Sequence, residues 1–370
     1  MSQIQTNKNP EAMETQSNEL DFSQQNIYVG FDVHLKSWKV TVMTEEVTYK
    51  TFAQDPKPEI LYQYLRKNFP GGNYFSAYEA GFCGYWIHNK LKSLGVNSFV
   101  INAADIPTSN KEKVQKEDKR DSRKIARSLR NGDLIPIYVP TSKTIEDRGL
   151  VRARSTLVKD QTRYKNRIKS FLYFHGIDIP ESFAKPESHW SKRFTSWLES
   201  IRMEEESAQI TLSSLLTELN HLRASVLDIS KKIRKLSETT GYKENVLLLR
   251  SIPGIGLLTS MELLTEIETI DRFTNLDKLC SYIGFVPSTH SSGEKDRTGD
   301  ITPRGHSVLR SALIESAWRA IKCDPALLKS YLDYCKRMDS NKAIVRIAKK
   351  LLSRIKYVLK NKQPYKYSIV

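Results

Sequence analysis

The sequence has no run of about 18 apolar residues, so no transmembrane helix is expected. Segment 1–25 is polar and lacks the apolar core of a signal peptide, and we expect it to be a disordered tail. Cysteine is scarce, with four residues in the chain, and no pair of them has zinc-ligand or redox spacing. The sequence therefore predicts thiols kept reduced, as in the cytoplasm.

Acidic residues are outnumbered, with 42 Asp and Glu against 58 Lys and Arg, which gives a formal net charge of +16. A basic excess of this size favours a polyanionic partner such as nucleic acid. The alternative is a protein that merely has many lysines. With 370 residues, of which 39% are hydrophobic, the chain is long enough for two or three domains with real cores.

Four carboxylates in the first third of the chain are the strongest chemical signal. Asp32 and Glu79 each end an apolar, β-prone run, while Asp118 and Asp121 lie three residues apart on one face of a predicted helix. Carboxylate oxygens are ligands for Mg²⁺, and two such ions can clamp the attacking and leaving oxygens of a phosphodiester. The four acids therefore predict a metal-dependent enzyme acting on nucleic acid. The alternatives are a turn-capping role for Asp32 and a solvated helix face for the pair.

Residues 26–140 alternate strand and helix patterns, which predicts an α/β domain. Strands are expected at 27–32, 38–43, 49–52, 74–79 and 97–101, and helices at 59–69, 85–94 and 116–130. Three strands in a row, followed by alternation with helices, is the order of a ribonuclease-H-like domain. Many other α/β domains share this order, so it does not decide the fold.

Residues 141–243 are predicted to form a helical linker with a basic first part. A helix over 142–174 carries eight Lys or Arg between positions 148 and 169, against the single acid Asp160. Mutual repulsion disfavours such a helix unless a polyanion is nearby, although a solvated helix face is the alternative. Four of these cations recur near one side and are predicted to contact nucleic acid: Arg148, Arg152, Lys159 and Arg163.

The second part of the linker has a strict 3-4 spacing of apolar residues over 212–236. The positions are Leu212, Leu215, Leu219, Leu222, Val226, Ile229, Ile233 and Leu236. A period of 3.5 residues sustained over more than three heptads is typical of a coiled coil. We predict that this seam joins copies of the chain into a dimer or tetramer. The alternative is a hairpin within one chain, against a helix near 197–203.

Residues 244–370 are predicted to form a mostly helical last domain. The turn Pro253-Gly254-Ile255-Gly256 joins two helices, as in a helix-hairpin-helix element, whose glycines leave backbone N–H groups for phosphate. The alternative is that the glycines let two helices pack closely. A basic amphipathic helix over 342–360 is expected to cover the core, with contact to nucleic acid as its alternative.

These features together resemble the IS110-family transposases, also called DEDD recombinases, which include the Piv-type DNA invertases. The resemblance covers about residues 26–370. The acid motifs are matched by Gly30-Phe31-Asp32-Val33-His34, Tyr78-Glu79-Ala80 and Asp118-Lys119-Arg120-Asp121. The C-terminal signature is matched by Ser251-Ile252-Pro253-Gly254-Ile255-Gly256, Gly284-Phe285-Val286-Pro287, Ser291-Ser292-Gly293, Ile301-Thr302-Pro303-Arg304-Gly305-His306 and Leu309-Arg310.

The resemblance implies a RuvC-like N-terminal domain, a coiled-coil linker and a C-terminal transposase domain. It implies site-specific recombination of double-stranded donor and target DNA, with Mg²⁺, or alternatively Mn²⁺, held by Asp32, Glu79, Asp118 and Asp121. It also implies that Ser292 attacks DNA and forms a covalent phosphoserine, with Ser291 as the neighbouring alternative. Family members of the insertion-sequence type use a bridge RNA, which would be a further partner.

Further expectations follow from the same resemblance. Arg304 joins the predicted nucleic-acid contacts, and the protein is expected with the nucleoid of a bacterium or archaeon. The chain departs from the family at Glu117, where Thr is usual, and at Ser122, where Ala is usual. The extra carboxylate at Glu117 leaves open which acids bind metal.

Three other functions stay open at this point. A RuvC-like junction resolvase, or a DNA invertase without guide RNA, would use the same acids. A non-catalytic nucleic-acid-binding scaffold would need neither the acids nor the serine. A phosphotransferase of the sugar-kinase type also begins with a strand that ends in Asp, but it needs Gly-rich phosphate loops that the first domain lacks.

Overall fold

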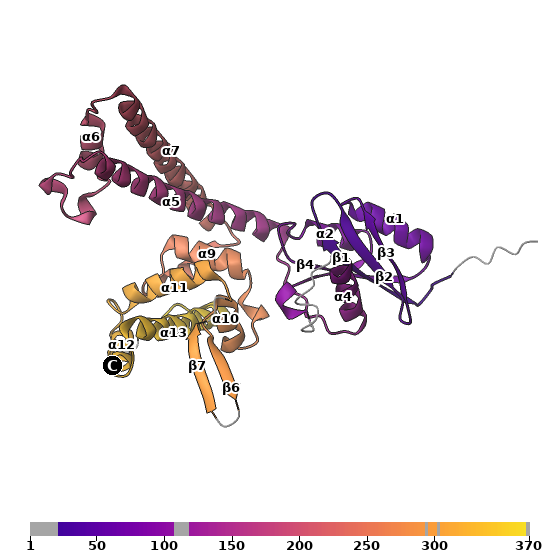
Figure 1. Cartoon of the computed structure of the whole chain (residues 1–370). Helices are drawn as coiled ribbons and strands as arrows, with labels where there is room; N and C mark the ends of the chain where they lie inside the picture. The colour runs from indigo at the N-terminus through magenta and orange to yellow at the C-terminus, as the bar shows by residue number, and fades with distance from the viewer. Residues whose placement is uncertain (1–20, 107–117, 293–294, 302–303, 368–370) are drawn as a thin grey trace, which may run out of the picture. The chain divides into compact units, whose positions relative to one another are not determined.

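The computed structural model describes residues 21–106, 118–292, 295–301 and 304–367, and the side chains of 118–119 and 288–300 lie outside that description. Most of the predicted tail, residues 1–20, is outside it as well. The chain divides into two compact units, of which the first ends at Val139 and the second begins at Pro140 (Figure 1). The further division predicted near residue 243 stays a prediction.

The first unit is built on a mixed sheet with the strand order β3-β2-β1-β4-β5. The strands are β1 (Asn26–Val33), β2 (Trp38–Met43), β3 (Thr48–Gln54), β4 (Asn73–Glu79) and β5 (Asn97–Ile101). β1 runs antiparallel to β2 and parallel to β4, and β4 runs parallel to β5. The carboxyl ends of β1, β4 and β5 therefore share one edge of the sheet, and all five strands lie where the sequence predicts them.

Helices cover both faces of this sheet, as the alternation along β1 requires. Ile27, Val29 and Phe31 pack in one core with α1 (Pro58–Asn68) and α2 (Trp86–Ser93). Gly30, which points to the opposite face, lies against α4 (Asp118–Arg130). The mixed sheet with helices on both sides confirms the α/β class of the first unit.

The described part of the second unit is mostly helical, as predicted, and includes a small hairpin. Its helices are α5 (Ser142–Phe174), α6 (Lys192–Ser200), α7 (Glu206–Ser237), α8 (Lys243–Arg250), α9 (Leu257–Ile267), α10 (Leu276–Ile283), α11 (Ser307–Ala320), α12 (Pro325–Cys335) and α13 (Ser340–Asn361). The hairpin pairs β6 (Pro287–Ser292) with β7 (Lys295–Ile301). Val151 of α5 and Ile233 of α7 enter the main core, so these long helices are anchored in the rest of the unit.

The predicted heptad seam on α7 packs against α5 of the same chain (Figure 1). Leu212 and Leu219 are buried in a cluster with Ile168 and Leu172 of α5, and α6 closes the far end of that cluster. This is the intramolecular alternative, with α5 as the main partner. Much of the seam is thus covered within one chain, and self-association through it stays a prediction.

Two further expectations for the second unit can be compared with the structure. Gly254, with a φ of 83°, lies where an added β-carbon would be 2.3 Å from the carbonyl oxygen of Ser316, so this glycine lets the turn pack closely on α11. The apolar stripe of α13 is buried in the main core, which confirms its expected covering role. Within the described part of the chain, no helix is long and apolar enough to span a bilayer.

Candidate active site

Asp32 and Glu79 extend from neighbouring strands at the carboxyl edge of the sheet. Phe31 and Tyr78 are register partners in the parallel pair of β1 and β4, and the two acids are the residues that follow them. The side chain of Asp32 is 22% exposed, and Glu79 is half-buried. In open α/β sheets, ligands bind outside the carboxyl ends of the strands. The structure therefore brings the first two predicted acids together at a suitable place.

α4 is held tightly against the sheet by two contacts. At Gly30, a β-carbon would lie 2.2 Å from the backbone nitrogen of Ala126 and 2.4 Å from the backbone oxygen of Ser122. The hydroxyl of Ser122 lies 2.9 Å from the hydroxyl of Thr41, which is buried on β2. This hydrogen bond explains why a serine suits position 122, where the resemblance leads us to expect alanine.

The direction of α4 points its first turn toward the two acids. Leu129 and Arg130, at its end, line the same pocket as Tyr28, near the start of β1. Ser122, one turn after the helix begins, lies over Gly30, two residues before Asp32. The helix therefore runs against β1, and its N-terminal turn, with Asp118 and Asp121, faces the carboxyl edge.

Gly30→Ala tests this close approach. Because the added methyl would meet helix backbone rather than a flexible side chain, α4 has to shift, and we expect a loss of about 1–3 kcal/mol in unfolding free energy. Denaturant unfolding measures it. Gly149→Ala is the matched control, since nothing lies within 4 Å of a β-carbon there and the residue is within α5. An unchanged midpoint for Gly30→Ala would contradict the packing described.

The donors at this edge have the chemistry of a magnesium site. The backbone of Asp118 is described, but its side chain is not. Glu117 lies wholly outside the described residues. Among the side chains that are described, no three of the types His, Cys, Asp and Glu come close enough to hold a metal. Mg²⁺ keeps several waters and is commonly held by one or two carboxylates plus substrate phosphates. Asp32 and Glu79 fit that mode, and oxygen donors suit Mn²⁺ as well.

His34 is a neighbour of this edge to which the sequence analysis assigned no role. Its Nε2 lies 3.0 Å from a carboxylate oxygen of Asp32, and its side chain is 49% exposed. The signal was its position two residues after Asp32, just beyond the strand.

Ser292, the predicted nucleophile, is the last residue of β6 and pairs with Lys295 across the turn. This hairpin is not predicted by the sequence pattern. The side chains of Ser291 and Ser292 lie outside the described residues, so the choice between them stays a prediction.

The base of the hairpin is closed by two glycines. Gly284 and Gly305 have φ values of 88° and 123°, and a β-carbon on Gly305 would lie 2.5 Å from the α-carbon of Gly284. The backbone nitrogen of His306 also donates to the carbonyl of Tyr282 at 3.0 Å. The chain thus enters and leaves the hairpin at one point, next to α10 and α11.

Comparison with known families decides what this combination belongs to. A family model described as "Transposase", of the IS110 DEDD type, matches residues 29–176, and one described as "Transposase IS116/IS110/IS902 family" matches residues 246–332. Together they cover the acids at the sheet edge, the basic helix α5 and the β6–β7 hairpin that carries Ser292. The chain belongs to the IS116/IS110/IS902 family of transposases.

Individual relatives have low sequence identity to this chain but align with most of its length. The chain is 29% identical to y4qE of Sinorhizobium fredii over 66% of its own length and 58% of that protein. It is 26% identical to the transposase for insertion sequence element IS1533 of Leptospira borgpetersenii, over 80% of this chain and 86% of that protein. It is 27% identical to the transposase for IS1111A of Coxiella burnetii, over 64% and 63% of the two chains. The chain therefore spans less than two thirds of the first and third relatives and most of the second.

Two of the predicted nucleic-acid contacts have an internal role in this transposase. Arg148 is buried, and its Nε donates to the carbonyl of Thr265 at 2.9 Å and lies 3.3 Å from the carboxylate of Glu266. Arg152 makes two hydrogen bonds to the same carboxylate, at 2.6 and 2.8 Å. Both arginines join α5 to α9. We remove the buried Arg148 from the predicted nucleic-acid surface, whereas Arg152, whose side chain is 60% exposed, stays a predicted contact. Their partner lies more than a hundred residues away and leaves no signal in the helical pattern.

Glu266 is the centre of this network, and sequence reasoning missed it. The Nε2 of His306 lies 3.1 Å from its carboxylate, while the Nδ1 of His306 accepts from the backbone nitrogen of Leu309 and caps α11. Burial alone would raise the pKa of Glu266, but hydrogen bonds from His306 and Arg152 outweigh it and hold the pKa at about 2. Glu266 therefore stays ionised and ties α5, α9 and α11 together below the hairpin.

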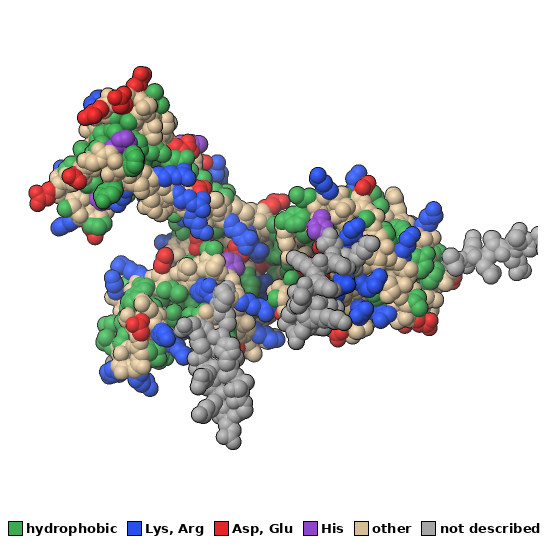
Figure 2. Space-filling model, in the orientation of Figure 1, with side chains coloured by type: hydrophobic (Ala, Val, Ile, Leu, Met, Phe, Trp, Pro, Cys, Tyr) green, Lys and Arg blue, Asp and Glu red, His purple; other side chains and the backbone are tan. Residues whose placement is uncertain are grey.

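The other predicted contacts lie on the surface. Lys159 and Arg163 are exposed on α5, along which Lys and Arg side chains gather (Figure 2). Arg163 pairs with Asp160 at 2.7 Å, but its side chain is 70% exposed, and such surface pairs are weak. Arg304 is exposed at the base of the hairpin. These three residues are still available for a nucleic-acid surface.

Proposed function

We propose that this transposase cuts and rejoins DNA with a divalent metal ion held by Asp32, Glu79, Asp118 and Asp121, and with Ser292 as the nucleophile. The observation that carries the proposal is the meeting of two acid-tipped parallel strands with the first turn of α4. The strand order, with three antiparallel strands followed by parallel ones, supports a RuvC-like, ribonuclease-H-like first domain.

The chemistry assigns separate tasks to the acids and the serine. When bound, Mg²⁺ would neutralise charge on the phosphate and help to activate an attacking hydroxyl. The carboxylates hold the ion and fix its place at the sheet edge. The serine oxygen forms a bond to phosphorus while one phosphorus–oxygen bond to deoxyribose breaks. A hydroxyl of another strand then reverses this step, so the bond energy is kept and rejoining needs no ATP.

Ser292→Ala tests the serine. With the wild-type protein, end-labelled donor DNA should form a covalent protein–DNA adduct on a denaturing gel, and Ser292→Ala should form none because the attacking oxygen is gone. Ser291→Ala is the matched control and should keep the adduct. Adduct formation by Ser292→Ala at the wild-type level would overturn the assignment. Cleavage by the wild-type protein without an adduct would instead favour a junction resolvase.

A further part of the proposal is that a bridge RNA guides the transposase to its DNA sites. The exposed cations of α5 support a polyanionic partner, although they do not distinguish RNA from DNA. We expect the purified transposase to recombine its sites only when the RNA encoded beside its gene is supplied. Unchanged recombination after ribonuclease treatment would favour an invertase-like action without RNA.

Self-association is proposed through the part of α7 that one chain does not cover. Ile210 and Leu227 on α7 are 57% and 64% exposed. We expect Leu227→Asp to lower the mass measured by light scattering. Wild-type protein that already has the mass of one chain, 42.6 kDa, would contradict the proposal.

A further inference from the structure

The exposed side of α13 is a basic stripe. Between Ser340 and Asn361 the helix has seven Lys or Arg and no Asp or Glu. From Lys342 to Lys360 its exposed positions follow 4-4-3-4-3 spacing and therefore lie on one face, opposite the buried stripe: Lys342, Arg346, Lys350, Ser353, Tyr357 and Lys360. At about 1.5 Å per residue, the stripe is roughly 27 Å long. Clustered cations of this kind are the usual footprint of a phosphate backbone.

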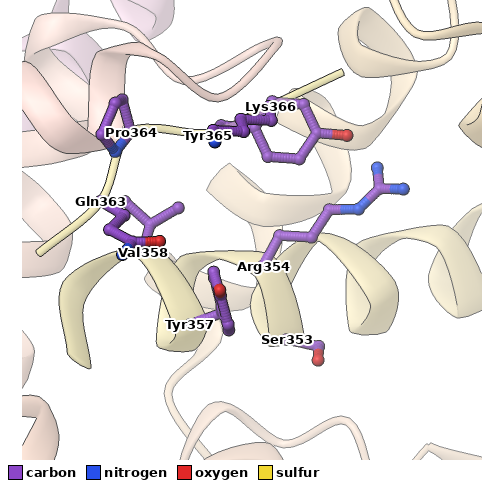
Figure 3. A pocket seen from close by; sticks show the side chains of 8 residues that line it. All are labelled: Ser353, Arg354, Tyr357, Val358, Gln363, Pro364, Tyr365 and Lys366. Carbon is purple, nitrogen blue, oxygen red and sulfur yellow. The ribbon is translucent and has the colours of Figure 1, made fainter. Parts of the chain in front are cut away.

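A pocket of about 410 Å³ opens at the C-terminal end of the stripe. It lies between α13 and the segment 363–366, which folds back over the helix after Lys362, whose φ is 53° (Figure 3). Its lining combines aromatic, polar and cationic groups, among them Tyr357, Ser353, Gln363 and Lys366. Tyr357 is 59% exposed, so its side chain is accessible to a ligand.

The back of the pocket is rigid. The backbone nitrogen of Tyr365 donates to the hydroxyl of Ser251 at 2.7 Å, and the phenol of Tyr365 donates to the buried Asp324. Arg354 also binds Asp324, at 3.1 Å, and its guanidinium lies 5.2 Å from the ring centre of Tyr365. Burial and the bond to Asp324 raise the pKa of Tyr365 to about 12, so the phenol keeps its proton. The pocket is thus preformed, and a ligand does not have to order it.

We propose that α13 and this pocket bind single-stranded DNA, with phosphates along the stripe and one unstacked base in the pocket against Tyr357. The volume lies within the range of small-ligand pockets, and stacking on aromatic rings beside cations is how proteins hold single strands. A duplex cannot supply the base, since its bases are paired and stacked. DNA is the strand type expected for a transposase. The inference depends on neither the acids nor the serine.

The test measures binding without cleavage, using the full chain in EDTA and a fluorescent oligodeoxynucleotide. Wild-type protein should bind the single strand more tightly than the matched duplex. Tyr357→Ala should weaken single-strand binding roughly 5- to 100-fold and leave duplex binding nearly unchanged, because one stacking contact is lost. Tyr357→Phe keeps the ring and should bind like wild type. Unaltered single-strand binding by Tyr357→Ala would overturn the proposal, as would tighter binding of the matched RNA.

A second measurement tests the cations. Removing Lys360 and Lys366 together should lower the slope of log affinity against log salt by about 1.4, at about 0.7 for each phosphate contact. Lys50 and Lys67, both exposed in the first unit, form the matched pair whose replacement by Ala should leave the slope unchanged. Equal effects of the two double variants would show that only net charge matters, which contradicts a binding track on α13.

Discussion

Asp32→Asn and Asp121→Ala should each reduce recombination by at least about 10²- to 10³-fold while leaving DNA binding close to wild type. Each variant removes a charge at the edge where the carboxyl ends of β1 and β4 meet the first turn of α4. The loss should fall on the chemical step because, in the proposed site, that charge would hold the ion that stabilises the transition state. Product formation from labelled donor and target DNA, at saturating protein, measures the effect.

Glu46→Gln is a suitable control for these two variants. Glu46 is an exposed acid of the same unit, in the turn between β2 and β3, and this turn lies at the opposite edge of the sheet. Its replacement should leave recombination unchanged. Recombination by Asp32→Asn at the wild-type rate would contradict the proposed metal site, and so would undiminished recombination in EDTA. Loss of DNA binding in parallel with activity would instead indicate a general defect of the fold.

Glu266→Ala should have the largest effect on stability. The carboxylate is buried and serves Arg148, Arg152 and His306 at once, so its removal leaves a buried cation without its partner. Breaking a buried pair from one side typically costs about 3–5 kcal/mol. Denaturant unfolding should show the loss in the second unit. Glu218→Ala is the control, since Glu218 makes an exposed pair with His221 and its replacement should change stability by less than about 0.5 kcal/mol.

The same carboxylate makes stability depend on pH. The pKa of Glu266 falls from its ordinary 4.5 to about 2 on folding, so the folded state favours the charged form. The resulting stabilisation, about 3 kcal/mol, is present above pH 4.5 and is lost as the pH falls toward 2. Wild-type protein should therefore lose stability over this range more steeply than Glu266→Gln. Parallel pH profiles of the two would contradict the assignment.

The strands and helices of the first unit follow from the sequence because their signals are local. Val29 and Phe31 alternate with Gly30 and Asp32, and that period of two is enough to place β1 and its two faces. The helix over 142–174 and the strand over 97–101 have the bounds that the sequence predicts. The β6–β7 hairpin cannot be predicted in this way, because its residues are mostly polar and lack the apolar alternation that marks a strand.

The candidate site also has features that the sequence predicts and features that it does not. Strand-end acids can be found from sequence, since a buried run that ends in Asp or Glu is a local pattern. The heptad seam is a local pattern too, but its partner is not: the residues that cover it, among them Ile168 and Leu172, belong to a separate helix. The hairpin with α5 therefore cannot be predicted from α7 alone. The internal role of Arg148 cannot be predicted from the sequence for the same reason, because Glu266 is remote in sequence and only the fold brings it to this arginine.

The contact between Gly284 and Gly305 has a consequence for how family members can diverge. Because the two ends of the intervening segment already touch, the course of α10 and α11 does not depend on what lies between them. Residues can be inserted or deleted there in matched pairs, lengthening or shortening the two arms equally, while the surrounding helices keep their positions. The length of the β6–β7 hairpin can therefore change, by evolution or by design, separately from the helices that support it.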